Sequence, residues 1–251
     1  MKLKEKIAII TGGGAGIGKA IALGMAKEGA NIVITDLIEE RLQKAEKDLK
    51  AMGVEVLALK SDVSIIADNK DMVDKTIQKF GKIDILVNNA GIGGSSGPFL
   101  EKDENTFDKV VAVNQKGMFF CTQLVAREMV KKNYGKIIGI CSAQGRIGVP
   151  MNAEYTGTKG AMIAMTRAIA AELSPMGINV NAIACGLTTD TEQFLAFNYP
   201  EEMTQMIVNI TPMRRTASVK DYVGIAVLLA SDEGSFITGQ TISVDGGISM
   251  P

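Results

Sequence analysis

The sequence predicts an α/β fold, a single domain built on a doubly wound parallel sheet with helices on both faces. Short runs rich in Ile and Val alternate with amphipathic stretches along almost the whole chain, as in right-handed strand–helix–strand units. The apolar runs lack polar alternation, which is typical of parallel strands buried on both faces. A length of 251 residues suits one α/β domain whose core needs no disulfides.

The expected elements follow the chain in order. A first strand over 6–11 leads through a glycine turn into a helix over 16–29. A second strand over 31–35 precedes a helix over 39–52, which Gly53 closes, because glycine readily adopts the left-handed conformation after a helix. The remaining expected strands are 54–60, 83–88, 136–141, 178–184 and 240–244, and the remaining helices lie near 66–80, 103–133 and 153–174.

The stretch 186–218 is the least regular part of the chain. It mixes the large apolar residues Phe194, Leu195 and Phe197 with polar ones. Functional residues are often carried on such segments, which can close over a bound substrate. We therefore expect a substrate lid at about 187–212.

Composition excludes several classes of function. The 27 basic and 28 acidic residues give a net charge of -1, which argues against a nucleic-acid binder. Histidine is absent, so Ser-His-Asp and Cys-His catalysis and the usual zinc sites are excluded, and we expect no metal. Cys121, Cys141 and Cys185 lack metal-site spacing and are interpreted as small buried hydrophobes. No apolar run has the length of a signal peptide or membrane span, so we expect a cytoplasmic protein with no membrane partner.

Residues 11–18, TGGGAGIG, join the first expected strand to the first helix. A helix N-terminus after a glycine turn offers unpaired N–H groups and a positive dipole end to an anion. Gly12, Gly16 and Gly18 would let the backbone turn sharply and approach a pyrophosphate. Glycine also serves tight turns for purely steric reasons, but the strand–turn–helix context favours a dinucleotide site.

Asp36 ends the second expected strand, where a carboxylate can accept hydrogen bonds from an adenosine ribose. A 2′-phosphate there would meet this carboxylate, and the neighbouring Gly14, Ala15 and Leu37 provide no base. The electrostatics therefore favour NAD(H) over NADP(H). The alternative is that Asp36 only caps the next turn.

Tyr155 and Lys159 lie four residues apart on an expected helix and therefore share one face. Lowering the tyrosine pKa from about 10 by ~3 units needs roughly 4 kcal/mol. A positive charge about 4 Å away supplies about that at an effective dielectric of ~20. We expect Lys159, helped by an oxidised nicotinamide, to make Tyr155 a general base near neutral pH.

Ser142 ends the fifth expected strand, at the sheet edge where open α/β sheets bind ligands. Its hydroxyl can donate to a substrate carbonyl, or it can cap the next turn.

With these residues in place, the chain resembles the short-chain dehydrogenase/reductase (SDR) family over essentially its whole length. The resemblance rests on TGxxxGxG at 11–18, Asp62-Val63, Asn88-Asn89-Ala90-Gly91, Asn114, Ser142, Tyr155-x-x-x-Lys159 and a closing Gly239 with Asp245-Gly246-Gly247. It implies a Rossmann-type fold and hydride transfer between NAD(H) and a small alcohol or ketone.

The resemblance also implies roles for individual residues. Ser142 would hold the reacting oxygen, Tyr155 would exchange its proton, Lys159 would bind the nicotinamide ribose, and Asn114 would hold a water in the proton relay. The implied cofactor-binding residues are Gly12, Gly16, Ile17, Gly18, Asp36, Asp62, Val63, Asn89, Ala90, Gly91, Tyr155, Lys159, Gly186 and Thr188. Three plainer alternatives remain: Asp62 caps a helix, Asn114 satisfies buried backbone, and Asn88-Asn89 forms a turn.

One position departs from the family pattern. Cys185-Gly186 stands where the family usually has Pro-Gly, and a cysteine restores a backbone donor and frees φ. We therefore expect a looser lid hinge and do not expect Cys185 to be a nucleophile. Thr188, Thr189 and Thr191 are the candidates for holding the nicotinamide carboxamide, and Thr188 is preferred because its backbone fits best.

The helix after Lys159 carries one charge between residues 160 and 171. A helix that is apolar on nearly all sides is buried or lies at an interface, so we expect a homo-oligomer. The resemblance suggests a tetramer with a second contact at 237–247.

We expect the substrate pocket between 95–99, 144–152 and the lid. Its candidate lining residues are Phe99, Met151, Phe194 and Phe197, and they favour an uncharged, fairly apolar secondary alcohol or ketone of cyclic, aryl or steroidal type. Ser142 and Tyr155 would bind its reacting oxygen, and Gln144 and Asn152 would orient a second polar group. An anionic substrate remains an alternative because Arg146, Arg214 and Arg215 are in this region.

Two rival functions remain. A 3-oxoacyl-[acyl-carrier-protein] reductase would share every motif, but it would need NADPH and a basic docking patch. A non-catalytic NAD-binding regulator would typically lack one of Ser142, Tyr155 and Lys159, and all three are present.

Overall fold

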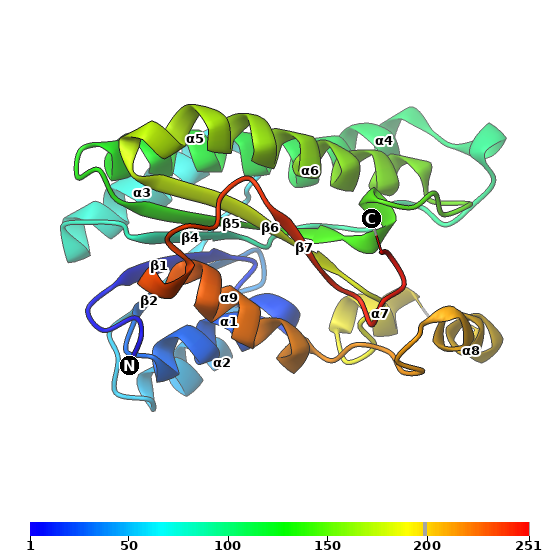
Figure 1. Ribbon diagram of the computed structural model, residues 1–251, viewed down its shortest axis with the longest axis horizontal. Helices are drawn as coiled ribbons and strands as arrows, with labels where there is room; N and C mark the ends of the chain where they lie inside the picture. Colours follow the sequence, from blue (N-terminus) through cyan, green and yellow to red (C-terminus); the bar gives the residue numbers. More distant parts are fainter. Residues whose placement is uncertain (198–199, 251) are drawn as a thin grey trace.

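The computed structural model describes residues 1–197 and 200–250, with the side chains at 193, 196 and 197 left out. Its centre is a seven-stranded sheet in the order β3-β2-β1-β4-β5-β6-β7 (Figure 1). All neighbouring strands pair in parallel. The strands are β1 Ile7–Thr11, β2 Asn31–Asp36, β3 Val56–Lys60, β4 Ile85–Asn88, β5 Gly135–Ser142, β6 Ile178–Cys185 and β7 Thr241–Val244.

Helices cover both faces of this sheet (Figure 1). One layer holds α1 Gly16–Lys27, α2 Glu39–Lys50 and α9 Val223–Ala230, and the other holds α3 Ile66–Phe80, α4 Glu104–Val110, α5 Met118–Val130 and α6 Ala153–Leu173. Two further helices, α7 Glu192–Phe197 and α8 Glu201–Ile210, lie beyond the carboxyl ends of the strands. The predicted Rossmann-type, doubly wound α/β fold is confirmed.

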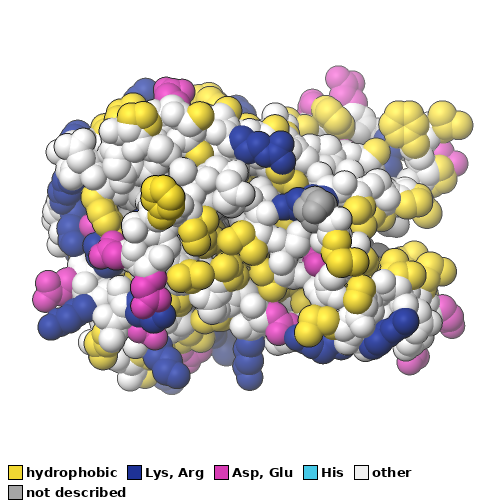
Figure 2. All heavy atoms as spheres, in the orientation of Figure 1, with side chains coloured by type: hydrophobic (Ala, Val, Ile, Leu, Met, Phe, Trp, Pro, Cys, Tyr) yellow, Lys and Arg dark blue, Asp and Glu magenta, His cyan; other side chains and the backbone are white. Residues whose placement is uncertain are grey.

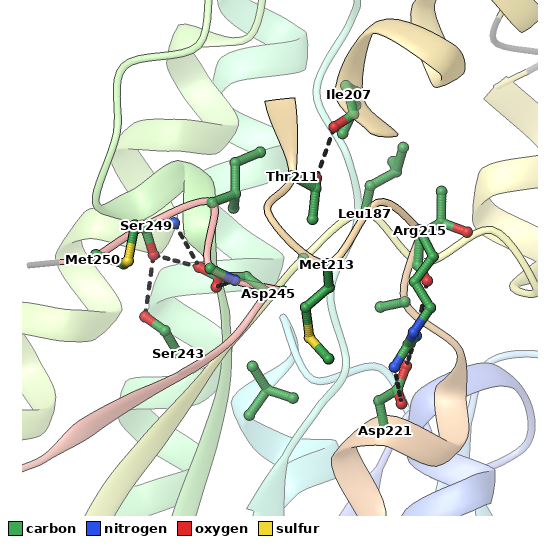
Figure 3. Close-up of a pocket in the computed structure, with 17 residues that line it drawn as sticks. Leu187, Ile207, Thr211, Met213, Arg215, Asp221, Ser243, Asp245, Ser249 and Met250 are labelled. Atoms are coloured by element: carbon green, nitrogen blue, oxygen red, sulfur yellow. Dashed lines mark hydrogen bonds and ion pairs between the residues drawn. The ribbon is translucent and has the colours of Figure 1, made fainter. Parts of the chain in front are cut away.

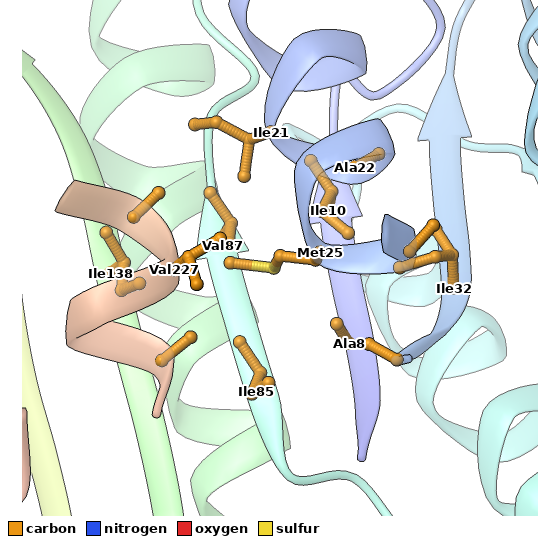
Figure 4. Packing of buried hydrophobic residues seen from close by; sticks show 14 of the residues in the cluster. Ala8, Ile10, Ile21, Ala22, Met25, Ile32, Ile85, Val87, Ile138 and Val227 are labelled. Atoms are coloured by element: carbon orange, nitrogen blue, oxygen red, sulfur yellow. The ribbon is translucent and has the colours of Figure 1, made fainter. Parts of the chain in front are cut away.

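The core forms because strands without polar alternation are buried on both faces. All five residues of β1 and all eight of β5 are buried. Ile10 of β1, Met25 of α1 and Val227 of α9 meet in one apolar cluster (Figure 4). The cysteines Cys121, Cys141 and Cys185 are free and buried, and burial raises their thiol pKa values to about 12, 11 and 12. Their interpretation as small buried hydrophobes is confirmed.

Three elements differ from the sequence expectation. The helix expected over 103–133 is interrupted by a π-helical segment, Val111–Gly117. The stretch 186–218 holds the helices α7 and α8 rather than irregular chain, because Pro200 and the acidic first turn of α8 favour a helix start. Helix α9 was not expected, since its sequence VGIAVLLA is apolar all round and has no 3.6-residue period.

No helix within residues 1–197 and 200–250 combines the length and apolar character needed to cross a membrane.

We expect Ile10→Ala to lower the free energy of unfolding by about 3 kcal/mol, because it leaves a cavity in a fully buried cluster. Ile65→Ala is the matched control, since that side chain is 49% exposed and its truncation should cost less than about 0.5 kcal/mol. Urea unfolding of both variants measures the difference. Equal losses for the two would contradict the assigned core.

Candidate active site

Polar residues end three adjacent strands at the carboxyl edge of the sheet. Thr11 ends β1, Asn88 ends β4 and Ser142 ends β5, where it pairs in register with Cys185 of β6. Ligands of open α/β sheets bind at this edge. The expected site residues therefore start from one side of the sheet.

The glycine turn after β1 has a backbone that other residues would not tolerate. Gly12 and Gly16 have φ angles of +61° and +54°, in the left-handed region that favours glycine. A Cβ on Gly18 would lie 2.3 Å from the Gly12 carbonyl oxygen and 2.4 Å from Nδ2 of Asn89. Ala15 caps α1 without a side-chain hydrogen bond. The turn thus offers bare backbone at a helix start, which fits a dinucleotide pyrophosphate.

Asn89 ties this turn to β4. Its Nδ2 donates to the carbonyl oxygens of Thr11 and Gly12 at 2.9 and 3.0 Å. In return, Thr11 Oγ1 accepts from the backbone N–H groups of Asn89 and Ala90 at 3.0 and 3.1 Å. Sequence reasoning missed Thr11 as part of the site, although it begins the glycine motif.

Asp36 contacts the glycine turn and caps the turn after β2, while its expected role at the adenosine ribose stays a prediction. One carboxylate oxygen accepts from the Gly14 N–H at 3.2 Å, and the other accepts from the Ile38 N–H at 3.1 Å. The carboxylate therefore faces the glycine turn and also caps the turn after β2. The sequence argument that no base lies near Asp36 is wrong. It considered only neighbours in the turn and overlooked Arg41, whose Cβ lies 2.9 Å from a Cβ built on Gly14.

Asp62 and Val63 sit between β3 and α3. Asp62 Oδ1 accepts from the N–H and the hydroxyl of Ser64 at 2.8 and 2.7 Å. This contact closes a local turn, whereas the N-cap of α3 is Ile65 without a side-chain hydrogen bond, so the helix-capping alternative is wrong. Val63 is 8% exposed and packs against Gly117 of the π-helical segment. Their expected role at the adenine stays a prediction.

Ser142, Tyr155 and Lys159 converge at the ends of β5 and α6. Ser142 is buried and hydrogen bonds to Tyr155, and its Oγ also accepts from the Gln144 N–H at 3.2 Å. Lys159 Nζ lies 5.6 Å from the centroid of the Tyr155 ring and donates to the Ile140 carbonyl at 2.9 Å. Ser142 and Tyr155 can therefore act on one substrate oxygen, with Lys159 beside the tyrosine ring.

Burial dominates the proton affinities of this group. It raises the pKa of Tyr155 to about 12, against the lowering effect of the Ser142 hydrogen bond, and it lowers the pKa of Lys159. The expectation that Lys159, helped by an oxidised nicotinamide, makes Tyr155 a general base near neutral pH stays a prediction, because it includes the positive charge of the coenzyme. Desolvation has the largest effect on the pKa of the phenol, and the Lys159 ammonium donates to the Ile140 carbonyl.

Asn114 lies in the π-helical segment, whose wider turn directs it toward α6. Its Oδ1 accepts from the Ile92 N–H at 2.8 Å, and its Nδ2 donates to the Ile92 carbonyl and to Thr158 Oγ1 at 2.9 and 3.2 Å. A Cβ on Gly91 would lie 3.2 Å from Asn114 Oδ1 and 3.5 Å from Lys159 Nζ. Asn114 thus satisfies buried backbone, as the alternative proposed, while lying beside Lys159. π-Helical insertions are frequent at functional sites.

The segment after β6 uses all three candidate threonine hydroxyls internally. Thr188 Oγ1 bonds to the Tyr222 hydroxyl at 2.7 Å, and Thr189 Oγ1 bonds to Thr216 Oγ1 at 2.9 Å. Thr191 Oγ1 donates to the Thr188 carbonyl at 3.2 Å. Gly186 packs closely on Asp245, because a Cβ added to Gly186 would lie 2.9 Å from the Cα of Asp245. Each of the three hydroxyls thus has a protein partner, and the choice of Thr188 for the carboxamide stays a prediction.

The expected substrate residues border α6. Gln144 Oε1 accepts from Asn152 Nδ2 at 3.2 Å, and Asn152 Oδ1 is buried with no partner among the described residues. Lys102 was not expected here. Its Nζ donates to Glu154 Oε1 at 2.9 Å and to the Met151 carbonyl at 3.1 Å. It fixes the loop before α4 against the residue that precedes Tyr155.

The apolar lining expected for the pocket is only partly assembled. Phe99 and Met151 are 74% and 49% exposed, Phe194 is half-buried, and the side chain of Phe197 lies outside the described residues. A cavity of about 490 Å³ lies between the lid and the C-terminal segment (Figure 3). Leu187, Met213 and Met250 line it, and Ser142 and Tyr155 do not. This cavity is not the pocket expected from the sequence.

Comparison with known proteins agrees with this geometry. The family model described as "Enoyl-(Acyl carrier protein) reductase" matches residues 12–249. An uncharacterized oxidoreductase of Thermotoga maritima is 37% identical, over 98% of each chain. The 3-oxoacyl-[acyl-carrier-protein] reductase FabG of Staphylococcus epidermidis is 36% identical, over 98% of this chain and 100% of its own.

Solved structures show the same relationship. NAD+-bound xylitol dehydrogenase has a TM-score of 0.95 at 33% identity, covering 98% of this chain and 100% of its own. Levodione reductase has a TM-score of 0.93 at 30% identity, covering 98% of each chain. Together with the whole-length family match, these likenesses show that the chain is an oxidoreductase that belongs to the short-chain dehydrogenase/reductase family.

Proposed function

We propose that this protein transfers a hydride reversibly between NAD(H) and an uncharged, fairly apolar secondary alcohol or ketone. The observation that carries the proposal is the meeting of Ser142, Tyr155 and Lys159 at the end of β5, next to a glycine turn with bare backbone. Proton transfer and dinucleotide binding are thus supported at one sheet edge.

Each catalytic side chain has a distinct task in this proposal. Ser142 would hold the substrate oxygen by a hydrogen bond, and Tyr155 would take its proton during oxidation or return it during reduction. Lys159 uses one of its three N–H donors on Ile140, which leaves two for the nicotinamide ribose. When bound, the oxidised nicotinamide would supply a positive charge and accept the hydride.

The choice of NAD(H) rests on the charges beside the glycine turn. The Asp36 carboxylate faces the turn, where it favours ribose hydroxyls and opposes a 2′-phosphate. Arg41 lies nearby, but it is paired with Glu192 at 2.5 Å. The unpaired charge at this position is therefore negative, which supports NAD(H).

The proposal of an uncharged substrate rests on the apolar residues expected in the pocket, and the three arginines of this region each contact another protein group. Arg146 donates to the Thr241 carbonyl and Arg214 to the Asn209 carbonyl, while Arg215 forms a bidentate pair with Asp221 at 2.7 and 2.9 Å. Only the charge of Arg215 is matched by a carboxylate, because Arg146 and Arg214 contact neutral carbonyls and keep further N–H donors. The buried, unpaired Asn152 Oδ1 favours a second hydroxyl or amide donor on the substrate.

Reduction of 3-oxoacyl groups on an acyl carrier protein is the second candidate, favoured by the FabG relative at 36% identity. It would need a basic docking surface for the acidic carrier. On the face seen in Figure 2, Lys and Arg are interspersed with Asp and Glu. A regulator without catalysis is disfavoured because Ser142, Tyr155 and Lys159 are present and assembled.

A homo-oligomer, expected as a tetramer, remains part of the proposal. Helix α6 leaves Ala164, Ala168 and Ala171 exposed, which is the apolar outer face that the sequence argument required. Phe236, within the loop that precedes β7, is fully exposed and adjoins the second expected contact at 237–247.

We expect cyclic, aryl or steroidal secondary alcohols to reduce NAD with at least about tenfold higher kcat/KM than with NADP. NADH absorbance over a panel of these alcohols measures this. The same enzyme should reduce a 3-oxoacyl thioester with NADPH only weakly. A preference for the thioester and NADPH would support the carrier-protein alternative instead.

Tyr155→Phe should lower kcat by about 10³-fold in both directions, because it removes the proton donor and acceptor. In the unaltered protein, oxidation uses the phenolate. With a pKa raised to about 12, the phenolate fraction grows roughly tenfold per pH unit below that value. The kcat/KM for oxidation should therefore rise between about pH 6 and pH 10, while reduction, which uses the phenol, stays flat. A plateau in oxidation near neutral pH would show that bound coenzyme lowers this pKa strongly.

Gly18→Ala should weaken NADH binding at least about tenfold, because a Cβ would meet the Gly12 carbonyl oxygen at 2.3 Å and displace the turn. Gly224→Ala in α9 is the control, since nothing lies within 4 Å of a Cβ there. Fluorescence titration with NADH compares the two. Unchanged affinity in Gly18→Ala would remove the glycine turn from the cofactor site.

A further inference from the structure

An ion pair connects the expected lid to the helix beside the glycine turn. Arg41 of α2 contacts Glu192, the first residue of α7, with 2.5 Å between Nη2 and Oε2. The side chains are 35% and 58% exposed. The pair therefore lies at the surface, where another anion can reach the guanidinium.

The position of Arg41 relates this pair to coenzyme choice. A Cβ built on Gly14 would lie 2.8 Å from Asp36 Oδ2 and 2.9 Å from Arg41 Cβ. The Asp36 carboxylate and the Cβ of Arg41 thus both lie beside Gly14. Asp36 is the proposed partner of the adenosine ribose, so the Arg41 side chain starts next to the position that a 2′-phosphate on that ribose would take. Its planar guanidinium suits a phosphate with two parallel N–H donors.

Glu192 is held where it competes for this guanidinium. The preceding Thr191 lies against the glycine turn, with its methyl group 3.6 Å from a Cβ built on Gly16. Thr191 Oγ1 also accepts from the Phe194 N–H at 3.2 Å, which fixes the first turn of α7. A 2′-phosphate would therefore have to displace Glu192 and approach Asp36 as well.

We propose that Glu192 determines coenzyme specificity by engaging Arg41, so that the guanidinium is not available to an adenosine 2′-phosphate. The inference rests on the proposed NAD(H) function and adds a lid residue to the adenosine end of the site. Asp36 alone repels the phosphate, whereas Glu192 also removes the cation that would attract it.

The test compares dissociation constants for NADH and NADPH by the fluorescence of the reduced coenzymes. The chain has no Trp, so no protein indole emission interferes. Glu192→Gln should lower the ratio of the NADPH to the NADH dissociation constant about 5- to 10-fold, by freeing a charge-assisted phosphate contact. Arg41→Met alone should leave the ratio no lower than in the unaltered protein. In the double variant Glu192→Gln, Arg41→Met, the ratio should return to the value of the unaltered protein.

Glu201→Gln is the matched control. It removes the same charge from an exposed position in the first turn of α8, and within the described residues Glu201 takes part in no ion pair. Its ratio should stay within about twofold of the starting value. A decrease equal to that of Glu192→Gln would assign the effect to net charge and overturn the proposal.

Two other results would overturn it. One is a ratio in Glu192→Gln within about twofold of the unaltered protein. The other is a gain that persists in the double variant, which would assign the phosphate to another cation such as Lys60, the register partner of Asp36. Absence of NADH binding in the unaltered protein would instead refute the cofactor proposal itself. Thermal unfolding checks that each variant is folded.

Discussion

The site depends on the contact by which Asn89 holds the glycine turn against β4. One amide group satisfies two backbone carbonyls of a turn whose φ angles are positive, and buried carbonyls without partners are costly. The contact is possible because Gly18 has no Cβ. Two residues further on, Gly91 lies beside Asn114 and Lys159. The segment 89–91 therefore joins the proposed phosphate site to the proposed proton-transfer site.

Among the catalytic residues, backbone contacts fix the positions of Lys159 and Asn114. Burial has the largest effect on the pKa values of Tyr155 and Lys159. Ile140 holds Lys159, and Asn114 reaches α6 through Thr158. Because Lys159 is drawn toward the sheet, its ammonium stabilises the Tyr155 phenolate less than a direct pair would. A positive charge brought in by the coenzyme would then decide whether Tyr155 acts as a base near neutral pH. Proton transfer is thereby coupled to cofactor binding.

The parts of the molecule that sequence could predict are those coded locally. Buried strands and the glycine turn are recognisable within about ten residues, and Tyr155 and Lys159 share a helix turn. Arg41 and Thr11 were missed because their partners, Glu192 and Asn89, are distant in sequence. Helix α9 was missed because complete burial removes amphipathic periodicity. For Asp36, the turn cap is observed, since one carboxylate oxygen accepts from the Ile38 N–H, while the other faces the glycine turn and its role at a ribose stays a prediction.

The same contacts bear on how the expected lid would move. Cys185 suggested a looser hinge, yet it pairs in register with both Ser142 and Val244, and the buried Tyr222 holds Thr188 just beyond it. Arg41 then tethers the start of α7. By contrast, α8 has no buried residue and exposes Met206 and Ile210 by 64% and 61%. Few buried contacts mean a low cost of local displacement. Motion of the lid should therefore reside in α8, while the hinge and the adenosine end stay fixed.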